Sequence, residues 1–291
     1  MNLQAPWRDI GITMITPTLD TMEQFFELVT TDFVLLALVS AILFSCVTGT
    51  IGCFLLWRNL SFLSDSMAHS TFLGVALGYV VAINPTISSI AVLSVFLILF
   101  VVLLRAHTNS RDALLSALAQ WFFALGVLIL STAEVATSNF QAMLFGDLLS
   151  VTILDLCLLM VIVLVTLVFL YFHFNNLILI SFHSDLALAE GIAVKNIELA
   201  LTCICGVIIV FAIKTIGILL VSALMVLPAL YAQVIAVSPK QSVLISTLMS
   251  VLMVTTGILL SLVFNFPPSP TIVFCMGSAY MIQKIYLRLA R

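Results

Sequence analysis

Residues 58–83 read RNLSFLSDSMAHSTFLGVALGYVVAI. The first half of this stretch carries Asp65 and His69, and the second half is continuously apolar. Residues i and i+4 lie on one face of an α-helix, so the carboxylate and the imidazole should project together. A helix that began only at Thr71 would extend about 20 Å over its thirteen residues, short of the ~30 Å hydrocarbon core. We therefore expect a membrane helix over 61–83 that carries both ionisable groups inside the membrane region.

The composition of the whole chain also indicates a membrane protein. Its 291 residues are 63% hydrophobic and only 8% charged, whereas a soluble domain carries about 25% charged residues. The apolar runs show no strict alternation, which favours helices over barrel strands. The sequence predicts an all-α, polytopic membrane helical bundle of about nine transmembrane helices, with eight as the alternative. Besides 61–83, the expected spans are 33–57, 87–106, 113–133, 153–174, 197–213, 215–237, 241–265 and 270–287.

The basic residues predict the orientation of these spans. With nine spans, eight of the ten lysines and arginines fall on one side of the membrane, and only Arg8 and Lys214 fall on the other. The positive-inside rule makes the first side cytoplasmic. We therefore expect the N-terminus outside and the C-terminus in the cytoplasm. The eight residues are Arg58, Arg105, Arg111, Lys195, Lys240, Lys284, Arg288 and Arg291.

The chain divides into two parts of unequal length. Residues 1–30 are expected to be an extracytoplasmic segment, and 31–291 a single transmembrane domain. Apolar residues near helical spacing make 18–31 either an amphipathic helix at the membrane interface or part of a tethered polar tail. No G-x-x-x-x-G-K-[ST] loop occurs, so any ATP that drives this protein must be bound by another chain.

Asp65 and His69 are the candidate metal ligands. A histidine nitrogen and a carboxylate oxygen suit Zn²⁺, Mn²⁺ or Fe²⁺. Two ligands form an incomplete site, which suits an ion in transit; Met67 or a second subunit could add ligands. The same pair could instead relay protons or hydrogen-bond a neighbouring helix. Ser66 and Ser70 form an adjacent polar stripe. Gly74 and Gly78 continue its four-residue spacing and predict a closely packed helix neighbour.

Five ordered stretches, spread over roughly residues 30–285, resemble a known family. The run WRNLSFLSDSMAHSTFLGVALGY is similar to the W-R-x-x-S-x-x-x-D-x-x-x-H segment of bacterial ABC-transporter permeases that import zinc, manganese or iron. His183 stands where that family commonly has an acidic residue, and NFPPSPTIV lacks its usual Asp and Gly, so no metal contact is carried over from that segment. The other four matching stretches are MLFGDLL (143–149), SFHSDLALAEGIAV (181–194), KTIGILLVSALMVLPALYA (214–232) and PPSPTIV (267–273).

The resemblance implies a function and a set of partners. The chain would be the permease subunit of a bacterial inner-membrane importer, with no catalytic chemistry, no permanently bound cofactor and no nucleic-acid partner. A permease homodimer, cytoplasmic ATP-binding subunits and an extracytoplasmic solute-binding protein would complete the importer. The residues implied to couple to the ATPase are Ser184, Asp185, Leu186, Ala187, Ala189, Glu190 and Gly191.

Two other classes of protein compete with this reading. A stand-alone secondary ion-coupled transporter should show inverted repeats and interrupted helices, and neither is evident in the sequence. An intramembrane metalloenzyme needs three or more protein ligands and a base. No H-E-x-x-H motif or histidine cluster is present.

Overall fold

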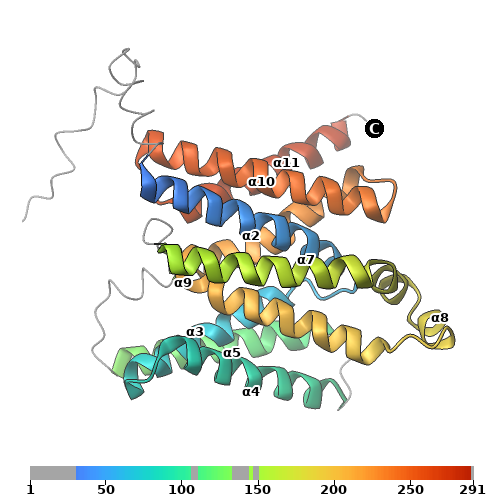
Figure 1. Ribbon diagram of the computed structural model, residues 1–291, viewed down its shortest axis with the longest axis horizontal. Coiled ribbons are helices and arrows are strands. Elements are labelled where there is room, and N and C mark those ends of the chain that lie inside the picture. The colour runs from blue at the N-terminus through green and yellow to red at the C-terminus, as the bar shows by residue number, and fades with distance from the viewer. Residues whose placement is uncertain (1–30, 106–110, 133–143, 147–150, 290–291) are drawn as a thin grey trace, which may run out of the picture.

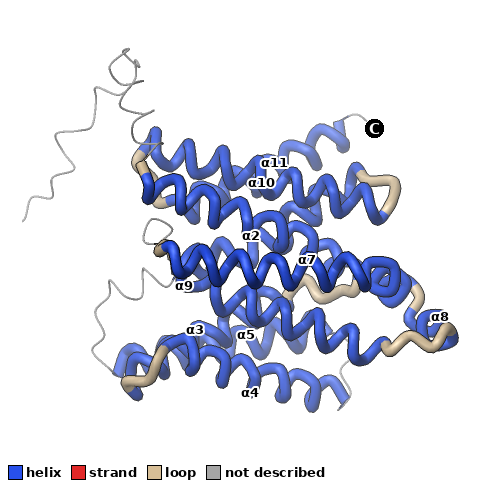
Figure 2. The backbone as a smooth tube through the Cα atoms, in the orientation of Figure 1, coloured by secondary structure: helices blue, strands red, loops and turns tan. Residues whose placement is uncertain are grey.

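The computed structural model describes residues 31–105, 111–132, 144–146 and 151–289. Every regular element within these ranges is a helix (Figure 2), which confirms the predicted all-helical bundle. The predicted segment 1–30 and the 18–31 helix lie outside the described residues. The helices are α2 (Asp32–Trp57), α3 (Leu63–Val81), α4 (Pro85–Arg105), α5 (Arg111–Thr132), α7 (Ile153–Phe182), α8 (Ser184–Ala189), α9 (Val194–Ile235), α10 (Pro239–Phe264) and α11 (Pro268–Leu289).

Six of these helices are long and apolar enough to cross a membrane by length and composition: α2, α4, α5, α7, α9 and α10. The helix predicted over 61–83 is present as α3, and its 19 residues are largely buried among other helices. The polar half of the quoted stretch is thus part of the bundle interior. The helix begins at Leu63, two residues after the predicted start.

The predicted spans over 197–213 and 215–237 fall in α9, which consists of two helices that meet at a kink. The break predicted at Lys214 was three residues early, because Lys214 is helical and the non-helical residue is Gly217. A straight helix of 42 residues would extend about 63 Å, twice the hydrocarbon core. Instead α9 bends at Gly217, where φ is 78° and ψ is 164°. That backbone region is essentially reserved for glycine, so one residue redirects the chain without a polar loop.

Helix α7 is longer than predicted. The apolar run suggested an end at residue 174, yet the helix continues through Asn175 and Asn176 to Phe182. Two asparagines lower the hydropathy but do not break helical hydrogen bonding, which only proline does strongly. The extension, in which Leu177 and Ile180 are buried, leads the chain to α8 at one end of the bundle (Figure 1).

Close packing around α3 fixes the centre of the fold. It contacts α4, α5 and α9, while α2 packs on α7, α9 and α10 (Figure 1). A Cβ added to Gly74 would lie 2.4 Å from the Cα of Ser89, and one added to Gly78 would lie 2.8 Å from the Cα of Pro85. The prediction that these glycines admit a close helix neighbour is confirmed, and the neighbour is α4.

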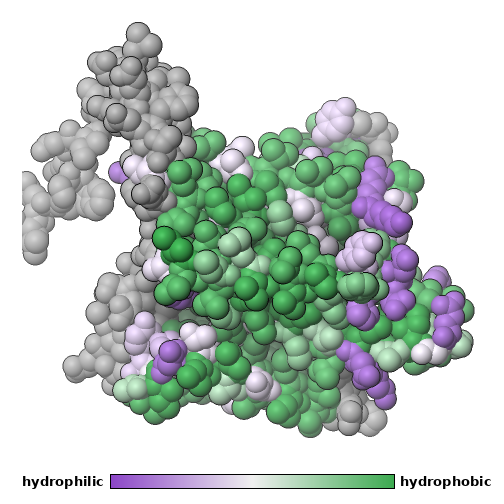
Figure 3. Space-filling model, viewed as in Figure 1, coloured by the Kyte–Doolittle hydropathy of each residue, from purple (hydrophilic) through white to green (hydrophobic). Residues whose placement is uncertain are grey.

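Apolar and hydrophilic residues occupy different parts of the surface. A broad apolar area covers the middle of the molecule, and hydrophilic residues gather at the end that carries α8 and the C-terminus (Figures 1 and 3). Helices α4 and α7 present many exposed aliphatic side chains. This distribution is typical of a protein whose flanks face lipid.

Candidate functional site

A tight turn before α3 positions the candidate site. Asn59 has a positive φ of 53°, a conformation that asparagine tolerates better than most residues. The backbone N–H of Leu60 then donates to the carbonyl of Leu55 at 2.9 Å and closes the end of α2. Arg58, whose side chain is buried, pairs with Glu198 of α9. Burial lowers the pKa of Arg58, and the nearby Glu198 carboxylate opposes that effect.

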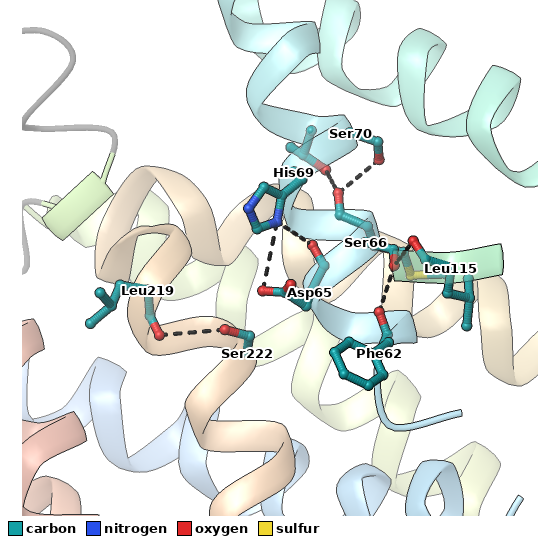
Figure 4. A network of polar contacts seen from close by, with 10 residues as sticks. Phe62, Asp65, Ser66, His69, Ser70, Leu115, Leu219 and Ser222 are labelled. Atoms are coloured by element: carbon teal, nitrogen blue, oxygen red, sulfur yellow. Dashed lines mark hydrogen bonds and ion pairs between the residues drawn. The ribbon is translucent and has the colours of Figure 1, made fainter. Parts of the chain in front are cut away.

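Asp65 and His69 lie together on one face of α3, as their spacing predicted. The Nδ1 of His69 is 3.6 Å from Oδ1 of Asp65 and 2.7 Å from the backbone carbonyl oxygen of Asp65. Figure 4 shows both side chains projecting from α3 toward the turn of α9 that contains Leu219 and Ser222. Asp65 lies in the first turn of α3, where the helix dipole favours a negative charge.

The contact with the carbonyl determines that the Nδ1 nitrogen of the imidazole carries a proton. A carbonyl oxygen can only accept a hydrogen bond, so Nδ1 of His69 must carry the proton. In the neutral ring Nε2 then keeps its lone pair. Metal-binding histidines commonly donate one ring N–H to a carbonyl or carboxylate and coordinate through the other nitrogen. The contact therefore orients His69 so that Nε2 is the nitrogen that would coordinate a metal.

An open groove adjoins this face of α3. It has a volume of about 360 Å³, and Asp65 lines it together with residues of α9 and α11, among them Leu219, Ser222 and Val273. The Asp65 side chain is 39% exposed and that of His69 is 23% exposed. The His69 ring also meets Phe123 of α5 edge-to-face, with ring centroids 4.8 Å apart. The Asp65 carboxylate is thus accessible from the groove, while Phe123 packs against the His69 imidazole.

The opposite face of α3 is closed. Met67, the possible third ligand, is 0% exposed and belongs to the apolar core, so this protomer does not present it beside Asp65 and His69. Ser66 donates to the carbonyl of Leu115 at 2.8 Å, and Ser70 donates to the carbonyl of Met67 at 2.8 Å. Among the described residues, no group of three or more His, Cys, Asp and Glu side chains could hold a metal. The two-ligand site therefore needs its further ligands from elsewhere.

A junction of three chain segments lies on α9 just before the residues that line the groove. A Cβ on Gly146 would lie 2.4 Å from the backbone N of Gly217, and one on Gly217 would lie 2.4 Å from the N of Gly146. Ser269 at the start of α11 hydrogen-bonds with its hydroxyl to the carbonyls of Phe145 and Ile216, the latter at 2.9 Å. We call Gly146, Gly217 and Ser269 the bend junction. It joins the 144–146 segment, the bend of α9 and the start of α11.

The predicted coupling residues form a separate feature. Ser184 to Ala189 make the short helix α8, which protrudes at one end of the bundle (Figure 1). Ala187 is buried and anchors α8, whereas Leu186 and Leu188 are 50% and 59% exposed. Gly191 has a φ of 78°, which allows the chain to turn back into α9. Helix α8 therefore exposes two leucines while Ala187 holds it against the bundle.

The other ionisable residues lie away from the groove. His173 lies inside α7, stacked on Phe169 with ring centroids 4.7 Å apart, and His183 is exposed between α7 and α8. Thr152 is the N-cap of α7 and forms a capping box with Asp155. The Asp155 carboxylate also pairs with Lys214 at 2.8 Å. His107, Glu134 and Asp147 fall outside the described residues.

Sequence reasoning missed the residues that face Asp65 across the groove. Leu219 and Ser222 are more than 150 positions away along the chain and lie in an unbroken apolar run. Pattern analysis of one helix cannot tell which distant helix packs beside it. The only local signal was the polar Ser222 within that run.

A bundle of long apolar helices with lipid-facing flanks, and a carboxylate–imidazole pair on an inner helix, defines a multi-pass membrane protein of the transport class. Comparison with known proteins makes this class specific. The chain belongs to the ABC 3 transport family, whose model matches residues 30–286.

Named relatives span nearly the whole of this chain. It is 32% identical over 251 residues to the high-affinity zinc uptake system membrane protein ZnuB of Buchnera aphidicola subsp. Schizaphis graminum, covering 85% of this chain and 95% of that protein. It is 28% identical over 247 residues to the manganese import system permease protein ScaB of Streptococcus gordonii, covering 85% and 88% of the two chains.

A solved structure shares the fold. A chain of PsaBC from Streptococcus pneumoniae in complex with Fab superposes with a TM-score of 0.80 at 24% identity, covering 93% of this chain and all of that chain. The match supports the arrangement of helices around α3 and α9.

Proposed function

We propose that this chain is the membrane-spanning permease subunit of an ATP-driven importer of divalent metal cations, with Zn²⁺, Mn²⁺ or Fe²⁺ as cargo. The observation that carries the proposal is the Asp65–His69 pair on one face of α3, with the Asp65 carboxylate open to a groove. The zinc and manganese systems of its relatives agree with this ligand chemistry. The chain supplies a path for the cation, and hydrolysis of ATP belongs to another subunit.

Incomplete ligation is what the site contributes to transport. Two protein ligands hold a divalent cation weakly, so the ion can leave again, as a permeation site requires. Asp65 supplies charge and His69 supplies a directional nitrogen. A second copy of the chain would add another Asp65–His69 pair if the groove faces the twofold axis of a homodimer. That arrangement would raise the number of ligands without Met67.

The complete importer has partners on both sides of the inner membrane. An extracytoplasmic solute-binding protein would deliver the metal at the end opposite α8. A cytoplasmic ATP-binding subunit would dock on Ser184 to Gly191, where Leu186 and Leu188 form an exposed apolar surface. Residues 1–30 would lie outside, and the C-terminus would lie in the cytoplasm.

The test of the function is metal uptake. Cells should accumulate radioactive zinc or manganese only when this chain and its ATP-binding partner are expressed together. A partner whose phosphate-binding lysine is replaced should support no uptake, because that lysine contacts the transferred phosphate. Uptake by this chain alone that stops when the proton gradient is collapsed would contradict the proposal and indicate a secondary carrier.

The test of the coupling surface is binding of the ATP-binding subunit. The double variant Leu186→Asp/Leu188→Asp should lose most of the co-purified ATPase, since it places charges in an apolar contact. The matched control is Leu289→Asp, which alters an exposed leucine of α11 at the same end. Equal recovery of ATPase with both variants would exclude α8 as the docking element. A Ser184→Cys thiol should resist an impermeant reagent added outside intact cells.

A further inference from the structure

A second cavity lies at the end of the bundle opposite α8, away from Asp65 and His69. It has a volume of about 370 Å³ and is bordered by α2, α4, α7 and α9, more than ten times the ~30 Å³ share of one water. Its wall includes Ser40 of α2, Asp155 of α7 and Lys214 of α9, and neither Asp65 nor His69 lines it. The metal path therefore does not account for this cavity.

Its apolar walls face out of the bundle. Ile87 of α4 and Leu158 of α7 line the cavity and are 62% and 50% exposed. Both helices have mostly exposed apolar spans, so this side of the cavity opens toward the lipid. A ligand that enters laterally between α4 and α7 must itself be largely apolar.

The mouth carries a pair of opposite charges. Lys214 Nζ lies 2.8 Å from Asp155 Oδ1, and the lysine side chain is mostly exposed. Asn84 and Thr86 at the start of α4 add polar groups to the same rim. A small hydrophilic spot interrupts the apolar surface near the start of α7 (Figures 1 and 3). A headgroup with both a positive and a negative charge would match both members of the ion pair.

The wall also holds an unpartnered hydroxyl. Ser40 is 0% exposed, and its Oγ has no hydrogen-bond partner among the described residues. Ser45 and Thr48 of the same helix instead donate to carbonyls one turn back, at 2.7 and 2.8 Å. The hydroxyl has no surface that a molecule in the cavity could contact, so Ser40 backs the cavity wall and does not bind the ligand.

We propose that this cavity binds a membrane phospholipid with a zwitterionic headgroup that carries a primary ammonium. The phosphate meets Lys214, and the ammonium meets Asp155. An acyl chain lies between Ile87 and Leu158. The bound lipid fills the gap between α4 and α7.

The experiment is native mass spectrometry of the delipidated full-length chain titrated with three lipids of identical acyl chains. Phosphatidylethanolamine should bind more tightly than phosphatidylcholine, whose ammonium cannot donate a hydrogen bond. It should also bind more tightly than phosphatidylglycerol, which has no positive charge for Asp155. Equal affinity for the three lipids, tighter binding of phosphatidylglycerol, or adducts of detergent alone would overturn the proposal.

Two variants locate the site. Lys214→Gln should weaken phosphatidylethanolamine binding about tenfold, as expected for loss of a charge-assisted hydrogen bond. The matched control Lys195→Gln, an exposed lysine at the other end of the first half of α9, should leave binding unchanged. Identical behaviour of the two lysine variants would contradict the assignment.

Discussion

The bend junction and the Asp65 groove lie close together along α9 but differ in packing: the junction is closed, and the groove is open. At the junction, backbone meets backbone, and a Cβ at Gly146 or Gly217 would come within 2.4 Å of the other segment. Leu219, two residues further on, lines an open groove of about 360 Å³. The junction fixes the path of the chain, whereas the groove leaves side chains free to meet an ion. The comparison shows that substitutions at the two places should fail for different reasons.

The largest effect on folding is expected from Gly217→Ala. The substitution adds a Cβ that overlaps the backbone of Gly146 and places alanine at φ 78°, ψ 164°, a conformation that costs on the order of 1–3 kcal/mol before the overlap is counted. The amount of monodisperse protein in size-exclusion chromatography should fall sharply. Gly277→Ala is the control, because a Cβ there meets nothing within 4 Å. Similar yields of both variants would show that the junction is not tightly packed.

A smaller loss of stability is expected from Ser269→Ala. Removing the hydroxyl leaves the carbonyls of Phe145 and Ile216 without this donor, which should cost roughly 1–3 kcal/mol. The melting temperature of the purified protein should drop. The control is Ser250→Ala, since Ser250 is equally buried but its hydroxyl has no hydrogen-bond partner among the described residues. If the control loses as much stability as Ser269→Ala, burial alone explains the effect.

The smallest effect on stability is expected from Ser222→Ala in the groove. Its hydroxyl is half-buried and has only a long contact, 3.5 Å, to the carbonyl of Leu219. Surface-like substitutions of this kind usually change stability by less than about 0.5 kcal/mol. Thermal unfolding of Ser222→Ala beside Ser269→Ala therefore measures the contrast directly. A drop as large as that of Ser269→Ala would mean that the groove is packed in the folded protein.

Much of the fold and part of the candidate site could be predicted from the sequence. Apolar runs located the helices, and the helix predicted over the polar stretch is present as α3, although α3 is not among the six helices long and apolar enough to span a membrane. The i, i+4 spacing predicted the proximity of Asp65 and His69, because helix geometry depends only on local positions. The bend at Gly217 was missed because glycine within an apolar run does not reveal its own backbone angles. Its contact with Gly146 joins residues far apart in sequence, and no local pattern encodes such a contact.

Met67 shows the limit of local reasoning within the site. It lies between Asp65 and His69 in sequence, and its thioether is a plausible soft ligand. A residue two positions from Asp65 lies on a different face of the helix, however, and that face packs into the core. Burial depends on which helices surround α3, and composition alone does not give that arrangement.

The central claim is that Asp65 and His69 form the path of the cation, and uptake by His69→Ala tests it most directly. Radioactive zinc and manganese uptake should be measured in cells with matched amounts of wild-type, His69→Ala, Asp65→Asn and His173→Ala chains. His69→Ala should reduce uptake to that of cells lacking the permease while the protein remains folded, because truncating a partly exposed side chain costs less stability than removing one from the core. Asp65→Asn should also impair uptake, since it keeps the shape and removes the charge. His173→Ala, which alters a histidine outside the groove, should transport normally. Normal uptake by His69→Ala at matched expression would contradict the site assignment and leave the family assignment intact.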